Sequence, residues 1–570
     1  MSSSPGFVVL PTISENSRLH LSCKATSDDK VVRLDRRDVL LGLTAVGAAV
    51  TTSNIGLAMA ADAGGQCAAM PIKAEDLQCA SVNGFQCPGL YNPQDIVDFS
   101  SLPRPKGLPR VRKAAHLLDA AYVGKFEEAV RRMKALPHDD PRSFKRQADI
   151  HEAYCANHYK VVPAGGGPKT VFDVHHSSIF APWHRMYLYF FEGILGDLIG
   201  DPTFGLPYWN WDTPEGMMMP SKFANESSPL YDAKRNPRRV RAVIDLNLSP
   251  GSKDGLPTCT DDHVCLIDNN LYTLYRQMIV ETPKQFYGGK FYNVELDDEG
   301  KQNHKVTGSL ENGAHNSAHI WLGDPCQKNQ DMGDLSTAAR DPIFYSNHSN
   351  VDRMWHIYIT KLGGGFLPYK EWLDTSFVFY DAQKRPVRIT VSDVLDVGKL
   401  GYMFEESGKL PWIGKRPKPA ANIQRHHGLK GTQTNSSYPM TLKKGEPQYL
   451  RLERLEKSRA GGGSSKKAPE ALVVDVTIDP CKYVKFDVLV NVPKGQEKKV
   501  GPQNSEFAGS FTQVPHGGGL EMKTRMVSYQ FALRELLEDL KCGKDNQLDI
   551  TLVLVEGDKV LIDDARIEVL

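Results

Sequence analysis

The hydrophobic pattern changes its period once along the chain, and this change limits the folds available. Up to about residue 406, apolar residues recur every three or four positions, as on the buried face of a helix. After residues 407–445, segments such as "ALVVDVTID" and "YVKFDVLVNVP" alternate apolar and polar residues, as half-buried strands do. The pattern predicts a mainly helical region followed by a β-rich one.

The chain has 570 residues, more than one compact core usually holds, so we expect more than one domain. Residues 407–445 are rich in Pro, Lys, Gly and Asn and are typical of a linker. We expect a mainly α domain, with a four-helix bundle and long loops, at 61–406. A β-rich domain, built as a sandwich or a barrel, should fill 446–570. The expected helices are 108–136, 142–160, 182–200, 265–283, 311–322 and 344–362.

The N-terminus has the pattern of a processing segment at 1–60. Adjacent Arg36 and Arg37 precede an apolar stretch of small residues that ends in Ala58-Met59-Ala60. A charged start, an apolar middle and an A-x-A site indicate a signal peptide, and paired arginines indicate the twin-arginine variant. With a Ser-rich leader before it, this favours a plastid protein delivered to the thylakoid lumen. Polar residues interrupt the apolar stretch, so we expect no stable membrane insertion of the mature form.

Charge and cysteine content narrow the class further. A net charge of +1 gives no reason to expect binding to nucleic acid. Ten cysteines are too few for a disulfide scaffold but leave room for some bridges in an oxidising compartment. Cys259 with Cys265, and Cys481 with Cys542, are two such options, and free thiols are an equal alternative for both.

Several histidines stand at spacings that suit metal binding. His315 and His319 are four apart, which places them on one helix face about 6 Å from each other. His175 and His184 flank "HSSIFAPW", and His348 begins another helical pattern. Two groups of three imidazoles inside a helical bundle would suit copper, zinc, iron or nickel better than magnesium or calcium. A zinc protease would need Glu after the first His of the pair, and Asn316 is there instead.

Four segments carry a family resemblance. "HEAYC", "VHHSSIFAPWHRMYLYFFE", "ENGAHNSAHIWLGD" and "RDPIFYSNHSNVDRMW" resemble the two copper-binding regions of plant polyphenol oxidases, of the catechol oxidase and tyrosinase type. The likeness extends to "KYVKFDVLVN" near the C-terminus and to the plastid-type leader. It implies an enzyme with two copper ions that uses O2 to oxidise o-diphenols to o-quinones.

The resemblance also implies roles for single residues. One copper would be held by His151, His175 and His184, and the other by His315, His319 and His348. His176 is a further histidine nearby, and His158, seven residues after His151 on the same helix face, could compete for the ligand role. Cys155 would be joined to His175 by a thioether bond, whereas a small buried thiol is what its spacing alone suggests. The remaining N-terminal disulfide would be Cys79–Cys87, because the partner positions of a second bridge hold Gln86 and Glu152.

Three further positions would govern the chemistry. Glu311 and Asn316 match residues that hold a water able to take the proton of a monophenol, which implies tyrosinase activity. Instead of this role, Glu311 could stabilise a helix N-terminus through its charge, and Asn316 could lie on a helix surface without a function. Leu335 stands at the gate position over the second copper and is smaller than the common Phe, which favours access for monophenols or bulky phenols. Asp352 and Arg353 are candidates to orient ligand rings or to form a packing ion pair.

The family's C-terminal domain covers the copper site and keeps the enzyme latent until a protease cuts the linker, here 407–445. "EFAGSF" at 506–511 could plug the pocket or form a hairpin in its own domain's core. Small phenols are the expected substrates, and a monomer or weak oligomer is the expected state. Two alternatives remain: a hemocyanin-like dioxygen carrier, and a narrow phenol oxidase such as an aurone synthase.

Overall fold

The computed structural model describes residues 71–570 with internal gaps. Outside the description lie 1–70 and 82–84, 86, 89–90, 104–106, 163–169, 250–262, 290–304, 407, 409, 424–436, 456–468 and 517–523. The predicted signal segment 1–60 and Cys259 fall in these parts. Among the described residues, no helix combines the length and apolar character needed to cross a bilayer.

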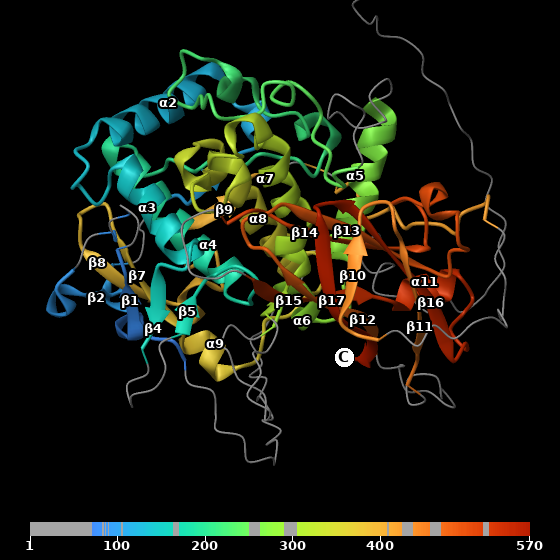
Figure 1. Ribbon diagram of the computed structural model, residues 1–570. Helices are drawn as coiled ribbons and strands as arrows, with labels where there is room; N and C mark the ends of the chain where they lie inside the picture. Colours follow the sequence, from blue (N-terminus) through green and yellow to red (C-terminus); the bar gives the residue numbers. More distant parts are fainter. Residues whose placement is uncertain are drawn as a thin grey trace, which may run out of the picture. The chain divides into compact units, whose positions relative to one another are not determined.

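Helices dominate the chain up to about residue 374 (Figure 1). They are α2 (Ala120–Ala135), α3 (Phe144–Cys155), α4 (Phe180–Leu198), α5 (His263–Met278), α6 (Pro283–Tyr287), α7 (Asn316–Leu322), α8 (Ile343–Thr360) and α9 (Lys370–Asp374). Each of the six predicted helices has a counterpart. The first is shorter than 108–136, because β3 (Arg110–Arg112) takes its beginning and Asp119 caps α2 by accepting from the backbone N–H of Tyr122.

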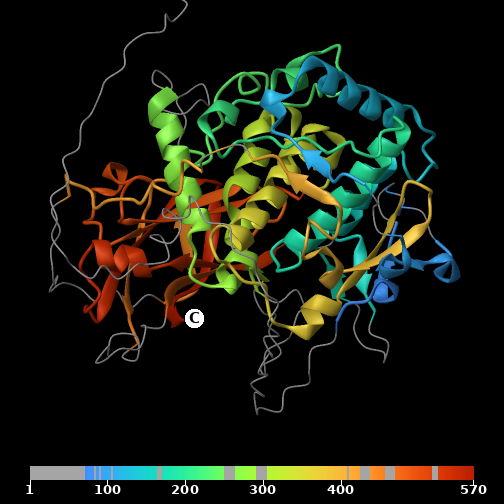
Figure 2. The ribbon, with the colours of Figure 1, turned by 180° about the vertical axis from the view of Figure 1, so that it is seen from behind.

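The helical region holds one hydrophobic core, and α3, α4, α7 and α8 lie together within it in both views (Figures 1 and 2). Helix α4 is nearly all apolar, and fifteen of its residues are buried, which places it at the centre. Short strands lie at the rim of this domain. They are β1 (Leu77–Cys79), β2 (Val97–Asp98), β4 (Tyr159–Val161), β5 (Thr170–Phe172), β7 (Ser376–Tyr380), β8 (Pro386–Thr390) and β9 (Tyr402–Phe404).

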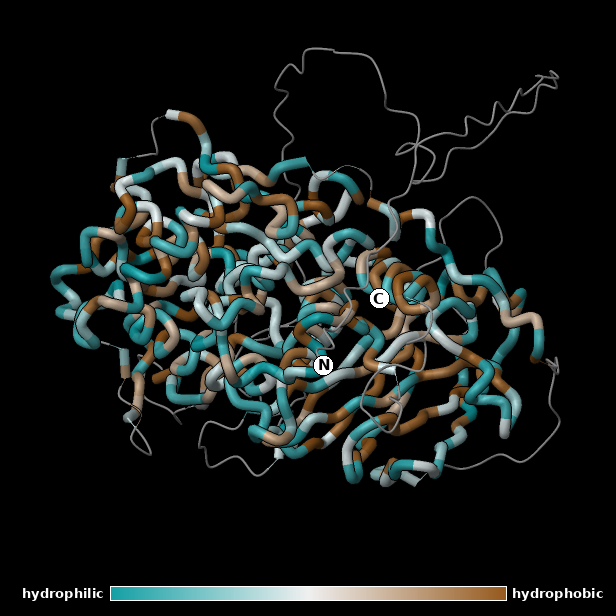
Figure 3. Tube along the Cα trace, turned by 90° about the horizontal axis from the view of Figure 1, so that it is seen from above, coloured by the Kyte–Doolittle hydropathy of each residue, from teal (hydrophilic) through white to brown (hydrophobic). Residues whose placement is uncertain are grey.

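Two open sheets form the C-terminal domain, as the alternation predicts. One has the order β10-β17-β12-β15-β6 and the other β11-β16-β13-β14, so neither closes into a barrel in the described part of the chain. The strands are β10 (Met440–Lys443), β11 (Gln448–Glu453), β12 (Glu470–Ile478), β13 (Val484–Val490), β14 (Phe507–Gln513), β15 (Arg525–Ala532), β16 (Gln547–Glu556) and β17 (Lys559–Val569), and α11 (Arg534–Asp539) follows β15. In Figure 3, hydrophobic stretches (brown) and hydrophilic stretches (teal) alternate along the chain.

Each domain has a core of its own. The helical core draws on residues from Ile72 to Trp412, and the sheet core on residues from Leu442 to Ile567. Separate cores indicate that each domain has its own source of stability. One strand crosses between them: β6 (Lys305–Thr307) belongs to the helical region but pairs in parallel with β15.

The predicted linker 407–445 differs from the structure at both ends. Trp412 is buried in the helical core and donates to Asp212, because an indole of that size gains more from burial than from exposure. At the other end, β10 pairs with β17, so the β-rich domain begins before residue 446. Between them, the backbone N–H of Ala420 donates to the carboxylate of Glu506.

Candidate metal centre

The first group of histidines comes from two helices and the loop between them. His151 lies on α3, His175 lies in the loop before α4, and His184 lies in the first turns of α4. All three are buried. The ring of His151 is 5.7 Å from that of His175 and 5.7 Å from that of His184, centroid to centroid. Residues far apart in sequence therefore converge on one point.

The second group is held by two helices at the centre of the domain. His315 ends a π-helical turn, η7 (Glu311–His315), His319 lies one turn later on α7, and His348 lies on α8. The ligand nitrogens of these three residues all lie within 4.8 Å of one another. The spacing of four, on which the sequence interpretation depends, does place two rings on one face.

The two groups face each other. The rings of His184 and His348 stack at 4.2 Å, and those of His175 and His315 stack at 6.2 Å. Two phenylalanines pack among them: Phe180 lies 4.6 Å from His184, and Phe344 lies 4.2 Å from His348. The six histidines and the two phenylalanines thus form one buried aromatic cluster.

Unpaired ring nitrogens are the clearest sign of a metal site. Nδ1 of His184 lies 2.8 Å from the carbonyl oxygen of Phe180. Nδ1 of His319 lies 2.7 Å from the carbonyl oxygen of Met332. The Nε2 atoms of all six histidines have no hydrogen-bond partner although they are buried. A buried polar atom without a hydrogen-bond partner costs folding free energy, so these nitrogens are expected to bind a ligand. Nδ1 of His151, His175 and His348 also lacks a hydrogen-bond partner. Rings held through Nδ1 with Nε2 free, as at His184 and His319, are typical of metal-binding histidine.

The protonation states agree with metal binding. Burial first, and the neighbouring histidines second, lower the pKa of His151, His184, His315 and His348 well below the usual range. Burial lowers the pKa of His319 to about 3. Neutral imidazole is the form that binds a metal. A donor set of six neutral nitrogens fits two copper ions and does not fit a hard cation.

Cys155 lies beside the first group. Its sulfur and the ligand nitrogens of His151 and His175 lie within 4.8 Å of one another. Cys155 is buried as a free thiol, and burial raises its pKa well above the usual range. A neutral thiol next to an imidazole is compatible with both the predicted thioether and a small buried side chain.

Glu311 is fully buried beneath the second group. Both carboxylate oxygens accept the backbone N–H of His176 at 2.9 Å. Burial raises the pKa of Glu311 to about 8, and the hydrogen bond from His176 opposes the rise. A carboxyl group with a pKa near neutrality can both take and return a proton.

The C-terminal domain reaches this pocket through residues 514–516. Val514 packs with Leu248, Ile320 and Leu335, and the backbone N–H of Leu335 donates to the carbonyl oxygen of Pro515 at 2.9 Å. The ring of His516 lies 5.5 Å from that of His175. The covering segment therefore follows "EFAGSF" instead of lying in it.

"EFAGSF" itself packs inside its own domain. Phe511 belongs to the core between the two sheets, and Phe507 packs with Leu489 and Val492. Of the two possibilities for this segment, the one in which it contributes to the domain core describes the structure.

Other candidate residues have structural partners. Asp352 binds Arg112, Arg185 and Tyr402, and Arg353 binds Asp212, so both form buried ion pairs. His158 stacks on Phe85, and Nδ1 of His176 lies 2.8 Å from the hydroxyl of Thr307.

The described cysteines are either disulfide-bonded or free thiols. Cys79 and Cys87 form a disulfide. Cys481 and Cys542 are both free thiols, so the bridge considered between them is absent. Cys265 is disulfide-bonded, and Cys326 is free.

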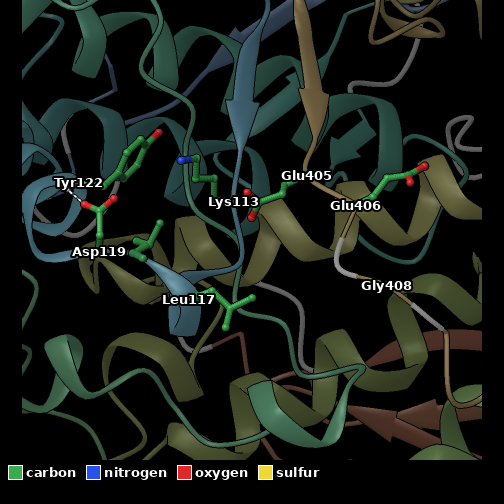
Figure 4. Close-up of a pocket in the computed structure, with 8 residues that line it drawn as sticks. Lys113, Leu117, Asp119, Tyr122, Glu405, Glu406 and Gly408 are labelled. Atoms are coloured by element: carbon green, nitrogen blue, oxygen red, sulfur yellow. Dashed lines mark hydrogen bonds between the residues drawn. The ribbon is translucent and has the colours of Figure 1, made fainter.

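A separate pocket of about 370 Å³ lies at the start of α2 and the end of β9 (Figure 4). Lys113, Asp119 and Tyr122 line one part of it, and Glu405 and Glu406 line another. No histidine contributes to it, so it is not the candidate centre.

Two residues at the centre, Asn312 and Arg525, were not predicted from the sequence, whereas Asn316 was. Asn312 and Asn316 both bind the backbone of β14, and Arg525 binds Asp173 at 2.8 Å. The spacing of four between the two asparagines could have indicated a shared helix face. No local pattern could have found Arg525, because it meets Asp173 only through the contact between domains.

Comparison with known families agrees with this geometry. Residues 141–361 match the common central domain of tyrosinase, 369–418 the polyphenol oxidase middle domain, and 438–569 the chloroplastic polyphenol oxidase C-terminal domain. The three segments follow the chain in the order of the two domains described above.

Individual relatives align over nearly the whole chain. The sequence is 37% identical to (+)-larreatricin hydroxylase, chloroplastic, of Larrea tridentata, over 97% of this chain and 95% of that protein. It is 38% identical to aureusidin synthase of Antirrhinum majus, over 85% of this chain and 84% of that protein. Among solved structures, latent apple tyrosinase superposes with a TM-score of 0.71 at 37% identity, over 83% of this chain and 99% of that one. A latent aurone synthase superposes with a TM-score of 0.74 at 32% sequence identity, over 88% of this chain and 99% of that one.

Proposed function

The chain belongs to the plant polyphenol oxidase family, and on this premise we propose that its six facing histidines hold two copper ions. The enzyme is a polyphenol oxidase of the catechol oxidase and tyrosinase class, which oxidises o-diphenols to o-quinones. The observation that carries the assignment is the set of six buried Nε2 atoms without partners. The proposed ligands are His151, His175 and His184 for one ion and His315, His319 and His348 for the other.

When bound, the copper ions supply the redox chemistry, passing electrons from the phenol to O2 as the co-substrate. The protein keeps the imidazoles neutral and holds them in position. Phe180 and Phe344 exclude water from the rings that they contact. The proposed thioether between Cys155 and His175 would fix the His175 ring in one orientation.

Glu311 and Asn316 are the proposed residues for monophenols. A monophenol has a pKa near 10 and must lose its proton to react. Glu311, with a pKa of about 8, would accept that proton through a water, and Asn316 would hold the water. In the structure Asn316 instead donates to the carbonyl oxygen of Thr512 at 2.7 Å, so the covering domain occupies the amide.

The proposed organisation has four parts: a plastid and twin-arginine leader at 1–60, a catalytic domain at 61–406, a linker at 407–445 and a shielding domain at 446–570. Residues 410–423 and 437–443 pack on one domain or the other, so a protease that cuts at 424–436 would spare both packed segments. Relatives are named chloroplastic, which supports a plastid address. The thylakoid lumen, the protease and a monomeric or weakly oligomeric state are proposals.

Specificity within the family is a second question. One relative is named aureusidin synthase and another (+)-larreatricin hydroxylase, so a narrow phenol substrate is a specific alternative for this chain. A dioxygen carrier is disfavoured, because the relatives are named as enzymes.

Oxygen consumption with tyramine and with 4-tert-butylcatechol tests the proposal, using copper-loaded protein before and after limited proteolysis. We expect uptake with both substrates and a rise after cleavage. Uptake with the catechol alone would remove the roles of Glu311 and Asn316. A protein that holds two coppers and consumes no oxygen with either substrate would refute the activity proposed here.

A further inference from the structure

One face of the second histidine helix matches the repeat of a β-strand. Asn316 and Ile320 are four residues apart on α7 and share a face, and Asn312, in the π-turn before α7, binds the same strand as Asn316. Opposite them lie Ser510, Thr512 and Val514, which are two residues apart along an extended chain. Two residues of a strand span about 6.7 Å and one helical turn about 5.4 Å, so the two repeats stay roughly in step over this length.

The contacts along this face are backbone contacts. Asn312 donates to the carbonyl oxygen of Ser510 at 2.7 Å and accepts the N–H of Thr512 at 2.9 Å. Asn316 donates to the carbonyl oxygen of Thr512 at 2.7 Å. Strand β14 is the last strand of its sheet, so these two amides satisfy the free edge of the strand.

The same extended chain ends at the catalytic pocket. Val514 enters the apolar group of Leu248, Ile320 and Leu335, and the next residue accepts the N–H of Leu335 through its carbonyl oxygen. One side chain thus enters the pocket while the backbone on both sides of it is hydrogen-bonded. We name the surface formed by Asn312, Asn316, Ile320 and the N–H of Leu335 the strand track.

We propose that the activated enzyme binds catechol side chains carried by an extended peptide, with the backbone on the strand track and the catechol ring in the place of Val514. The inference rests on the proposed function and names a substrate class for the same site. For a peptide that carries 3,4-dihydroxyphenylalanine, the ring loses two electrons and two protons and becomes an o-quinone. Two such rings reduce one O2 to two molecules of water.

The chemistry of the track selects backbone amides. It offers two side-chain N–H donors, one backbone N–H donor and one carbonyl acceptor, which is what an extended chain needs and a simple catechol cannot use. The pocket side chains Leu248, Ile320 and Leu335 carry no charge that would favour a free amino acid.

The test compares two capped peptides on cleaved, copper-loaded protein. The heptapeptide has the sequence of residues 510–516 with 3,4-dihydroxyphenylalanine at the position of Val514. The acetylated tripeptide keeps only the residues matching 513–515, and its acetyl carbonyl takes the place of that of Thr512. The shorter peptide therefore lacks the two bonds to Asn312 together with the side chains that match Ser510, Phe511, Thr512 and His516, and the Asn312 variant isolates the contribution of the two bonds. We expect the heptapeptide to have a kcat/KM about tenfold higher, the effect of two ordinary hydrogen bonds.

Substitution of Asn312 completes a double-mutant cycle in which the peptide is shortened in one step and Asn312 is replaced in the other. In Asn312→Leu the preference for the heptapeptide should vanish, whereas Asn225→Leu, at an exposed asparagine with only local contacts, should keep it. Equal values for the two peptides in the unsubstituted protein would overturn the inference, as would a preference that survives Asn312→Leu.

Binding without turnover separates this inference from the proposed function. A dye-labelled heptapeptide with phenylalanine at the position of Val514 cannot be oxidised, and fluorescence anisotropy reports its affinity. We expect the unsubstituted protein and Asn225→Leu to bind it about tenfold more tightly than Asn312→Leu does. Equal affinities would refute the strand track even where catechol is oxidised. Loss of catechol oxidation with the affinity difference retained would refute only the proposed function.

Discussion

At the scale of single residues, the centre depends on what burial does to protonation. The histidines are neutral because burial opposes their charge, and Glu311 holds a proton more readily for the same reason. Sequence could predict that His315 and His319 lie together, because spacing on a helix fixes which rings share a face. It could not predict which carboxyl group would have its pKa raised, since that depends on everything packed around it.

Glu311→Gln tests the proton acceptor. The amide keeps the shape and can still accept the N–H of His176, but it cannot take a proton. We expect the ratio of tyramine to 4-tert-butylcatechol turnover to fall by about 10²-fold or more, the usual range for loss of a general base. An unchanged ratio, in protein with unchanged copper content, would leave Glu311 with only its helix-terminal role.

Leu335→Phe tests the gate. Leu335 is packed against Val514, Ile320 and Leu248, so a larger ring would fill the pocket from which Val514 withdraws. In cleaved protein we expect lower kcat/KM for 4-tert-butylcatechol than for unsubstituted catechol, and a lower ratio of monophenol to diphenol turnover. Identical ratios in the two proteins would refute a gating role.

Cys155→Ser tests the thioether. Peptide maps of copper-loaded protein should contain a cross-linked pair, lighter than the sum of the two free peptides by two hydrogen atoms, that joins the segments of Cys155 and His175. The variant should yield both peptides free. Finding both peptides free in the unsubstituted holoprotein would assign Cys155 to packing alone.

At the scale of elements, the segment that carries the second group of histidines begins with an irregular turn. The apolar period predicts one helix over 311–322, but residues 311–315 form a π-turn with Gly313 at φ −85° and ψ −126°. Gln277 of α5 inserts there, accepting the N–H of Ala314 at 2.8 Å and donating to the carbonyl oxygen of Leu310 at 3.3 Å. Such insertions come from a neighbouring element, so the periodicity of one segment cannot predict them.

Gln277→Leu removes this support with little change of volume. Two buried backbone groups would lose their partners, which costs about 1–3 kcal/mol each, and the helix that carries His315 would shift. We expect a lower melting temperature and less than two coppers per chain. The matched control is Thr273→Ala on the same helix, whose hydroxyl bonds only the backbone of Asn269. A Gln277→Leu protein with full copper content would show that the π-turn holds its shape alone.

At the scale of the whole molecule, the two domains meet through buried charge. Burial opposes the ionised form of Asp173, and Arg525 with Lys305 outweighs that effect, so the pKa of Asp173 stays well below its usual range. The division into a helical and a β-rich part was predictable from the change of period. The interface was not, because its partners come from opposite ends of the chain.

Arg525→Met should weaken latency. The variant leaves Asp173 as a buried carboxylate without its closest cation, a loss worth about 3–5 kcal/mol in comparable buried pairs. We expect catechol oxidation by uncleaved protein to rise toward the level of cleaved protein. Arg534→Met is the control, since its pair with Glu281 is partly exposed and such pairs contribute about 0–1 kcal/mol. Equal activity of the two uncleaved variants would refute a locking role for Arg525.

The parallel pairing of β6 with β15 sets an order of events during biosynthesis. Lys305 leaves the ribosome long before Val527, yet the two strands can pair only when both exist. Contacts between distant segments form late, because a long loop must close before they add stability. The segment that leads into Glu311 and His315 thus gains its last support when the final strands of the chain fold. A nascent enzyme would therefore complete its second metal site and its own cover at nearly the same moment.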